Sequence, residues 1–353
     1  MKKWIFYNLT TLFFILTLIG TFNWYVDPMW AFNHKQPFLE LKGEFNEREQ
    51  KTNLVNFRKF DYDGIILGSS KISIINQNNI KNYRVFNYAA NAMNIYEFNN
   101  YIEFAKKKNK KPFKVIVLGL DFDSIQENAI GEKFNFTNVL STIQDPFYRQ
   151  KLLFSADTFI FSKNNIDFNI RESYSQHFKM YDKNYIAYTI KHNPKNVETE
   201  IKNATYNNQK IIYDRTKYLN CLNEIKRNNP NTKFVIMITP LNEVYFKTLM
   251  MNNQTEEIYK LWLNDLVNIF GQINNFAYVN SVTQDYQNTY VDTKHFNSAI
   301  GKLMIDFSFK QQVDQESKKY TNDFGIFLTK ENLNFYINKF ISDSKNTKSL
   351  SYR

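Results

Sequence analysis

A serine that directly follows an apolar run is the first candidate for chemistry in this sequence. Residues 62–73 read YDGIILGSSKIS, so the run ends at Gly68 and is followed by Ser69 and Ser70. A serine at the carboxyl end of a buried strand can attack an acyl carbonyl if a neighbouring base takes its proton. The same serines can instead cap the next helix by accepting hydrogen bonds from backbone N–H groups. The local sequence leaves both roles open.

A base and an orienting carboxylate occur together near the end of the chain. In YVDTKHFNSAIGKLM, Asp292 precedes His295 by three residues, so its carboxylate can reach Nδ1 and leave Nε2 facing the serine. The other histidines, His34, His177 and His192, lie near the N-terminal apolar segment or in an irregular region, and none has metal-binding spacing. The pattern predicts a Ser-His-Asp site, and we expect neither a metal nor a cofactor.

An uncharged N-terminal segment indicates where the protein resides. Lys2 and Lys3 are followed by 23 uncharged residues, Trp4 to Val26. This length crosses about 30 Å of hydrocarbon as a helix. The alternatives are a cleaved signal peptide, which the bulky residues after the segment disfavour, and a buried helix of a soluble protein. Because positive residues stay inside, we expect a single-pass anchor in the cytoplasmic membrane with the remaining chain in the periplasm or cell exterior.

The rest of the chain alternates between apolar runs and helical patterns. The runs predict strands at 63–67, 83–89, 113–122, 232–240 and 276–282, the last of these being the final strand. Between them, 94–111 has helical spacing, and 298–311 predicts the last core helix. Continuous apolar strands separated by helices are typical of a mostly parallel sheet covered on both faces, so we predict a doubly wound α/β domain.

The domain organisation follows from these patterns. Residues 1–30 form the predicted anchor, and 31–60 form a linker and lead-in with a short helix. Residues 61–345 form the extracytoplasmic domain. The polar, aromatic stretch at about 123–209 interrupts the strand–helix alternation and is interpreted as a helical insertion. Since it follows the carboxyl end of the third strand, where such sheets bind ligands, we expect it to cover the site.

Charge and cysteine content exclude few functions. The formal net charge is +11, and the densest basic run, Lys106–Lys111, ends a predicted helix, where it complements the helix dipole and stays solvated. No zinc-finger, RRM or helix-turn-helix pattern accompanies it, so we expect no nucleic-acid partner. The single cysteine, Cys221, allows no disulfide within the chain.

The order of these motifs resembles the SGNH (GDSL-type) hydrolase superfamily. LGSSKIS stands where that family has its Gly-Asp-Ser block, and DTKH stands where it has Asp-x-x-His. The resemblance implies a flavodoxin-like three-layer sandwich. It also implies that Ser70, not Ser69, is the nucleophile and that His295 and Asp292 are its partners.

Two other family blocks differ here, and both concern the oxyanion hole. FNYAANAMN offers Ala89 or Ala90 where the family has a glycine whose N–H donates. LGLDF places Asp121 where the family has a donating asparagine. An ionised carboxylate repels an oxyanion, so either Asp121 has another role or a different donor serves, with Asn91 as a candidate.

With its membrane segment, the chain is most similar to accessory proteins of envelope acylation, such as the teichoic-acid D-alanylation component and the alginate O-acetylation proteins. The resemblance covers roughly residues 60–125 and 230–310. It implies transfer of an acyl group onto a cell-envelope glycan, or its removal, beside a multi-spanning membrane-bound O-acyltransferase. The alternatives are a lipase or esterase of the same fold and a non-catalytic partner or glycan-binding component with a degenerate site. The sequence names neither the acyl group nor the glycan.

Overall fold

The computed structural model describes residues 1–125, 136–171, 178–190, 194–204, 206 and 211–346. The chain divides into two compact units. Unit 1 comprises Met1–Asp61 and Phe134–Ala187, and unit 2 comprises Tyr62–Lys133 and Tyr188–Arg353. The stretch expected to be one insertion, 123–209, therefore contributes to both units.

Unit 1 begins with a long apolar helix, α1 (Lys2–Val26). Among the described residues, α1 is the one helix long and apolar enough to cross a membrane. It ends at Asp27, which takes a left-handed conformation (φ 43°) and donates its N–H to the carbonyl of Asn23. The Asp27 carboxylate then accepts the N–H groups of Ala31 and Phe32 at 2.8 and 3.0 Å. The chain therefore turns sharply where the apolar segment ends.

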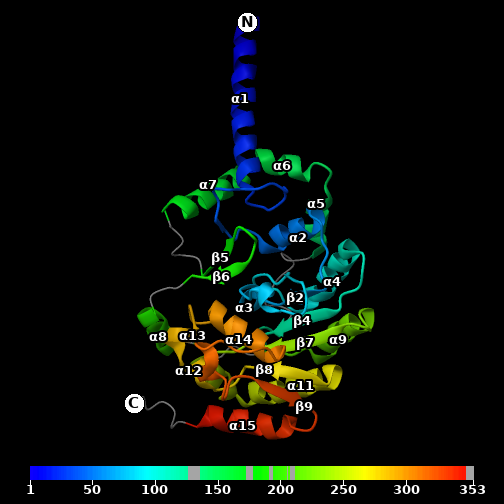
Figure 1. The fold of residues 1–353 in the computed structure, drawn as a ribbon, viewed down its shortest axis with the longest axis vertical. Coiled ribbons are helices and arrows are strands. Elements are labelled where there is room, and N and C mark those ends of the chain that lie inside the picture. The colour runs from blue at the N-terminus through cyan, green and yellow to red at the C-terminus, as the bar shows by residue number, and fades with distance from the viewer. Residues whose placement is uncertain (126–135, 172–177, 191–193, 205, 207–210, 347–353) are drawn as a thin grey trace. The chain divides into compact units, whose positions relative to one another are not determined.

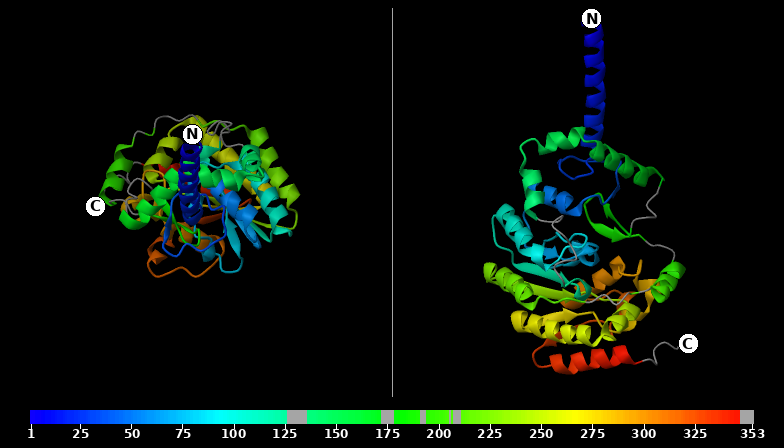
Figure 2. Two further views of the ribbon diagram at one scale, coloured as in Figure 1. Left: turned by 90° about the horizontal axis from the view of Figure 1, so that it is seen from above. Right: turned by 180° about the vertical axis from the view of Figure 1, so that it is seen from behind.

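Among the described residues, the rest of unit 1 combines four helices with two short strands and the first residue of a third. They are β1 (Leu41–Lys42), α2 (Glu47–Phe57), α5 (Phe136–Gln144), α6 (Tyr148–Phe154), α7 (Ala156–Arg171), β5 (Lys179–Asp182) and β6 (Ala187–Thr189), which continues into unit 2. The strands form one sheet in the order β1-β5-β6, with β1 antiparallel to β5. The helical insertion predicted at about 123–209 contains α5, α6 and α7, but it also contains the strands β5 and β6, which were not predicted because strands of three or four residues are too short to show a clear alternating pattern. Figure 2 shows α6 and α7 on either side of the lower end of α1.

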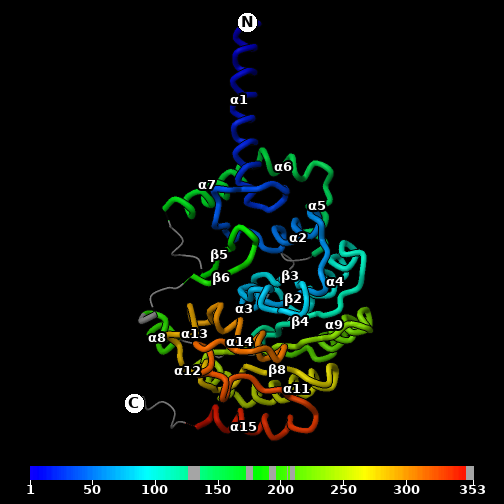
Figure 3. Tube along the Cα trace, viewed as in Figure 1, coloured from blue at the N-terminus to red at the C-terminus, as the bar shows by residue number. Residues whose placement is uncertain are grey.

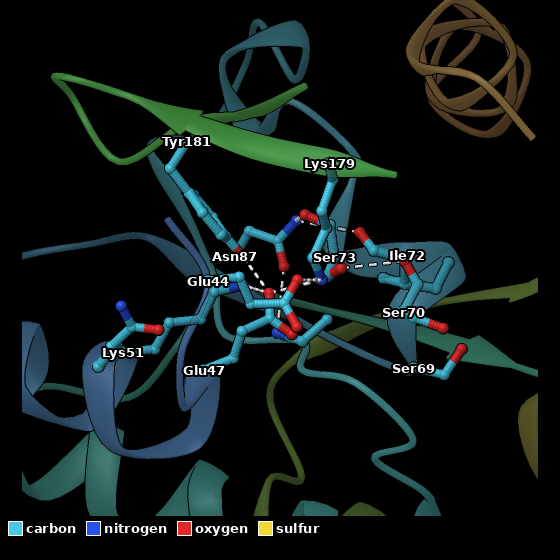
Figure 4. Close-up of polar contacts among 12 residues, drawn as sticks. Glu44, Glu47, Lys51, Ser69, Ser70, Ile72, Ser73, Asn87, Lys179 and Tyr181 are labelled. Carbon is cyan, nitrogen blue, oxygen red and sulfur yellow. Dashed lines mark hydrogen bonds and ion pairs between the residues drawn. The ribbon is translucent and has the colours of Figure 1, made fainter. Parts of the chain in front are cut away.

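A buried ion cluster joins α2 to β5 inside unit 1. Lys179 Nζ lies 2.6 Å from Glu47 Oε1 and 3.3 Å from Glu44 Oε2, and Tyr181 donates its hydroxyl to Glu47 (Figure 4). Burial and the neighbouring Glu47 raise the pKa of Glu44 to about 7. Burial opposes the charge on Glu47 too, but Lys179 and Lys51 hold the pKa of that carboxyl below its ordinary value. The cluster thus keeps its charges paired although water is excluded.

Unit 2 is built on a six-stranded sheet in the order β3-β2-β4-β7-β8-β9. Its strands are β2 (Gly64–Leu67), β3 (Val85–Asn87), β4 (Val115–Leu120), β7 (Lys233–Ile238), β8 (Gln272–Asn275) and β9 (Ile326–Thr329). The first five strands in this order are parallel, and β9 is antiparallel to β8. Strands β2 and β4 are buried at every residue. The prediction of a mostly parallel α/β sheet is therefore confirmed.

Helices cover both faces of this sheet. They are α3 (Ser70–Ser73), α4 (Ile95–Asn109), α8 (Pro194–Asn203), α9 (Arg215–Asn228), α10 (Glu243–Met250), α11 (Asn253–Phe270), α12 (Ser281–Gln284), α13 (Tyr286–Thr289), α14 (Ser298–Ser308) and α15 (Leu333–Lys345), with 3-10 turns η1 (Gln77–Asn79), η2 (Phe122–Ser124) and η5 (Ser317–Tyr320). Helices α4, α9 and α11 pack side by side on one face, while α14 packs against β7 and η1 on the other (Figure 1).

The predicted end of the fold was wrong in two respects. The strand expected at 276–282 lies earlier, as β8. Its apolar signal is weak because two of its residues are buried asparagines: Asn274 Nδ2 donates to the carbonyl of Ile236 at 2.7 Å, and Asn275 Nδ2 donates to the hydroxyl of Tyr259 at 3.2 Å. In addition, β9 and α15 follow the helix expected to be the last, as the trace in Figure 3 shows. A four-residue edge strand carries little apolar signal, so only its pairing with β8 reveals it.

Candidate active site

The candidate residues lie at one edge of the unit 2 sheet. The expected nucleophile Ser70 follows the carboxyl end of β2, Ala89 follows β3 and Asp121 follows β4. Because these strands are parallel neighbours, their carboxyl ends lie at the same edge, where doubly wound sheets bind ligands. The fold therefore gathers residues from three separate segments.

The two serines have different positions in the turn after β2. Ser69 is the N-cap of α3, and its Oγ accepts the N–H of Lys71 at 3.2 Å, whereas Ser70 is the first helical residue. The turn is tight because Ile72 lies against the sheet. A Cβ on Gly68 would lie 2.6 Å from Ile72 Cγ1, and one on Gly119 of β4 would lie 2.0 Å from the same atom. Both positions therefore require glycine for α3 to lie where it does.

A hydrogen-bonded relay joins Ser70 to His295 and Asp292. His295 Nε2 lies 2.8 Å from Ser70 Oγ, and His295 Nδ1 lies 2.7 Å from Asp292 Oδ2. The side chain of His295 is only 16% exposed and that of Asp292 is 32% exposed. The geometry is that of a nucleophile, a base and a group that orients the base.

The protonation state of the relay follows from the partners of Asp292. Its Oδ1 accepts the backbone N–H groups of Lys294 and His295, each at 2.7 Å. Burial favours the neutral acid, but the His295 side chain and these N–H groups outweigh it and hold the pKa of Asp292 below 3.8. An ionised carboxylate only accepts hydrogen bonds, so Nδ1 of His295 carries a proton. In the neutral imidazole Nε2 is then the acceptor, and Ser70 donates its hydroxyl to it.

The loop that carries His295 is held at both ends. Tyr290 and Phe296 form an antiparallel bridge, and the N–H of Val291 donates to the carbonyl of His295 at 2.9 Å. At its tip, the side chain of Asn242 donates to the carbonyl of Thr293 at 2.8 Å. His295 is thus positioned by backbone contacts within its loop and by a hydrogen bond from Asn242 outside it.

The residues expected to form the oxyanion hole have other partners in this structure. The N–H of Ala89 donates to Asn87 Oδ1 at 3.0 Å, and the N–H of Ala90 donates to the carbonyl of Gly68 at 3.1 Å. Asn91 follows in the same loop and is half-buried. Ser70 begins α3, a position at which a backbone N–H has no acceptor within the helix. The N–H of Ser70 therefore has no acceptor within α3.

Asp121 belongs to a buried ion cluster. Lys71 Nζ lies 2.8 Å from Asp123 Oδ1 and 4.0 Å from Asp121 Oδ1, and Thr239 donates its hydroxyl to Asp121. Burial alone would lower the pKa of Lys71, but Asp123 and then Asp121 outweigh it and raise the pKa above 10.5. The carboxylate of Asp121 is thus balanced by an ammonium group, which gives it a role other than oxyanion donor.

Removing the ammonium group from this cluster is expected to destabilise unit 2. Lys71→Met leaves two carboxylates with side chains only 5% and 8% exposed and no adjacent cation, which we expect to cost about 3–5 kcal/mol in the free energy of unfolding. Because the pKa of Lys71 is raised on folding, its pairing is fully present at neutral pH and is lost only as the pH rises through that raised value. Denaturant unfolding at pH 7 measures the change.

The matched control for this cluster is the double variant Lys71→Met/Asp123→Asn. It removes the closer of the two carboxylates together with the ammonium group, so it should recover part of the lost stability. Equal unfolding midpoints for the wild type and Lys71→Met would show that the cluster contributes nothing to stability.

Sequence patterns did not reveal the residues that support the relay. Asn87, at the end of β3, donates its side-chain amide to the carbonyls of Ile72, Ser73 and Ile75 at 3.1, 3.3 and 2.8 Å. Figure 4 shows Asn87 directed at the first two of these carbonyls. The available signal was an amide side chain within an apolar strand, since a buried asparagine needs partners. Its partners, however, lie 12 to 15 residues away and depend on how α3 turns.

A scan against protein-family models and a search of curated proteins found no match to this chain. The chemistry of the site is therefore inferred from its geometry.

Proposed function

We propose that this chain is a membrane-anchored, extracytoplasmic O-acyltransferase or esterase that acts on a cell-envelope glycan. Ser70 is the nucleophile, His295 the base and Asp292 the group that orients it. The observation that carries the proposal is the unbroken hydrogen-bonded relay, 2.8 Å from Ser70 Oγ to His295 Nε2 and 2.7 Å from His295 Nδ1 to Asp292 Oδ2.

In the proposed reaction, Ser70 Oγ attacks the acyl carbonyl carbon and its proton moves to His295 Nε2. The tetrahedral intermediate collapses as the bond to the leaving alkoxide breaks, and His295 returns the proton to that oxygen. A sugar hydroxyl or water then attacks the acyl-enzyme and gives its proton to His295. Collapse of the second intermediate restores the Ser70 hydroxyl. Asp292 stays ionised throughout and stabilises the imidazolium.

Stabilisation of the oxyanion is the second requirement of this proposal. The N–H of Ser70 supplies one donor, and the loop after β3 lies beside it, since the N–H of Ala90 donates to the carbonyl of Gly68. Hydrogen-bond donors of this kind contribute about 2.7–4 kcal/mol each to the transition state in serine hydrolases.

The topology of unit 2 supports membership of the SGNH-like, flavodoxin-like class. When its five parallel strands are numbered along the chain, β2, β3, β4, β7 and β8 become strands 1 to 5, and their order across the sheet is 2-1-3-4-5. This is the order of flavodoxin-like folds. The position of Ser70 directly after the first of these strands supports the same assignment.

The proposed location follows from α1. Its length and composition support a single-pass anchor in the cytoplasmic membrane, and Lys2 and Lys3 place its N-terminus inside by the positive-inside rule. The catalytic residues then face the periplasm or cell exterior. We propose that a multi-spanning membrane-bound O-acyltransferase supplies or receives the acyl group there.

One observation favours a second candidate function, a non-catalytic partner or glycan-binding component. The N–H groups of Ala89 and Ala90 both donate to acceptors within the chain, so neither is available to an oxyanion in this conformation. A protein that kept the fold while its oxyanion hole degenerated would have this arrangement.

Covalent labelling distinguishes the two functions. We expect a fluorophosphonate to add once to the full-length protein, on Ser70 Oγ, because His295 removes the proton of that hydroxyl. Intact mass measures the adduct, and Ser70→Ala and His295→Ala should both abolish it. Ser69→Ala is the matched control and should label as the wild type does. A folded wild-type protein that forms no adduct would refute the catalytic proposal and favour the non-catalytic partner.

A further inference from the structure

A corner between two helices of unit 1 encloses the end of α1. The side chains of Met1 to Leu18 are exposed around the whole helix, and the rest of unit 1 covers α1 only from Ile19 onward. The corner consists of α6, α7 and the preceding Phe147, and we call it the α6–α7 corner. Figures 1 and 2 show its two helices beside the lower end of α1.

Specific contacts seat α1 in this corner. A Cβ built on Gly20 would lie 3.1 Å from Cε1 of Phe154, and the rings of Phe22 and Phe159 lie 5.4 Å apart. Asn23 is 1% exposed, and its amide donates to the carbonyl of Leu153 at 2.9 Å. The last two turns of α1 and the corner therefore form one packed element.

The length of α1 indicates the depth of these contacts in the bilayer, which is the edge of the hydrocarbon core. Trp4 to Leu18, the part of the uncharged stretch that the rest of unit 1 does not cover, is 15 residues long and rises about 22 Å as a helix. A hydrocarbon core of about 30 Å needs about 20 residues, which extends from Trp4 to Asn23. Any tilt of the helix lengthens the segment required. The level of Gly20 and Phe22, where Phe154 and Phe159 contact α1, therefore lies at the edge of the hydrocarbon.

The outer side of the corner has the composition of a membrane-surface helix. Large apolar side chains are exposed there: Phe147 64%, Phe154 54%, Phe159 41% and Ile160 52%. The exposed Lys151 lies between Phe147 and Phe154 in the chain and the exposed Lys163 follows Ile160 on α7, as in helices that lie in the interface. Exposing these apolar side chains to water would be unfavourable. Through Phe154 and Phe159, the apolar surface of the corner is continuous with the apolar surface of α1.

We propose that the α6–α7 corner inserts into the outer interface of the phospholipid bilayer, as a second membrane contact besides α1. This inference rests on the proposed membrane anchor. A single transmembrane helix leaves unit 1 free to tilt and rotate, together with that helix, relative to the membrane. The corner removes that freedom and holds unit 1 at one depth and orientation on the membrane.

Quenching by brominated lipids tests this directly in the full-length protein. In a Cys221→Ser background, one environment-sensitive fluorophore is attached at a time through Phe147→Cys, Ile160→Cys, Leu12→Cys or Phe335→Cys, all positions that are exposed in the structure. The labelled proteins are reconstituted into liposomes of phosphatidylethanolamine and phosphatidylglycerol, with and without phosphatidylcholine brominated both near the headgroup end and near the methyl end of its chains. Leu12 reports on the anchor, and Phe335 on α15 of unit 2 is the water-exposed control.

Brominated lipid should reduce the emission at Leu12, Phe147 and Ile160 and leave that at Phe335 unchanged. Loss at Leu12 alone would overturn the inference while leaving the anchor intact, and would assign the corner to water or to a protein partner. No loss at Leu12 would refute the anchor itself and the inference with it. Phe147 and Ile160 lie on different helices, so the result does not depend on one variant folding.

Discussion

Ser70→Ala is expected to lower kcat for a small soluble ester by about 10⁴- to 10⁶-fold, the range found when serine hydrolases lose their nucleophile. The residual rate is that of a site that can bind substrate but forms no acyl-enzyme. The reason is positional, since Ser70 Oγ is the atom that donates its proton to His295 Nε2 at 2.8 Å. Release of a chromogenic alcohol from an acetyl ester by the full-length protein measures this rate.

Ser69→Ala is the matched control, because it makes the same change at the adjacent serine, whose hydroxyl caps α3 rather than hydrogen-bonding to His295. Ser69 caps α3 by accepting the N–H of Lys71, so its loss should cost about 1 kcal/mol of stability and leave kcat near the wild-type value. If Ser70→Ala kept the wild-type rate, or if Ser69→Ala lost the rate instead, Ser70 would not be the nucleophile.

Asp292→Asn is expected to lower kcat by about 10³- to 10⁴-fold without changing the position of the loop. The backbone N–H groups of Lys294 and His295 both donate to Oδ1, so an asparagine must keep its carbonyl oxygen there. Its NH₂ group then takes the place of Oδ2 and donates to Nδ1 of His295. That fixes the proton on Nε2, which can no longer accept the proton of Ser70.

The matched control for this variant is Lys294→Ala. It changes a side chain beside Asp292 but keeps the backbone N–H that donates to Oδ1, so its kcat should stay close to that of the wild type. The rate of fluorophosphonate addition should fall in parallel with kcat in Asp292→Asn, since both depend on deprotonating Ser70. An Asp292→Asn variant with wild-type kcat would mean that His295 needs no orienting carboxylate.

Both expectations assume that Asp292 is ionised under the assay conditions. Its pKa is held below 3.8 in the folded protein, so the hydrogen bonds it accepts stabilise the loop above its unfolded pKa and are lost as the pH falls through the lower folded value. Assays near neutral pH therefore measure the intact relay.

The buried strands of unit 2 were predictable because parallel strands covered on both faces are apolar at every position. Gly64–Leu67 and Val115–Leu120 are buried throughout, and the corresponding apolar runs are plain in the sequence. The strand Gln272–Asn275 was not predicted because it contains two buried asparagines. Their amide nitrogens donate hydrogen bonds to distant residues, which no apolar pattern shows. Polar residues in a core are explained by their partners, and those partners are distant in sequence.

Among the site residues, the contact between Asp292 and His295 was predictable from the sequence, because a separation of three residues brings the two side chains within hydrogen-bonding distance. The contact between His295 and Ser70 joins residues 225 apart, and it exists because β2 lies between β3 and β4 and the loop before α14 meets the same edge of the sheet. The pairing of Lys71 with Asp123 likewise depends on β2 and β4 being neighbours.

The sequence by itself therefore determined the apolar strands, the candidate membrane helix and the types of residue available for acyl chemistry. Composition and short-range spacing are enough for these features, because they depend only on local geometry and on which segments avoid water. The tertiary structure alone decided how closely Ser70 meets the histidine, what balances the charge of Asp121, and which N–H groups after β3 already have acceptors. These contacts depend on the order of the strands in the sheet and on the path of the turns between them. Neither can be deduced from the types of the individual residues.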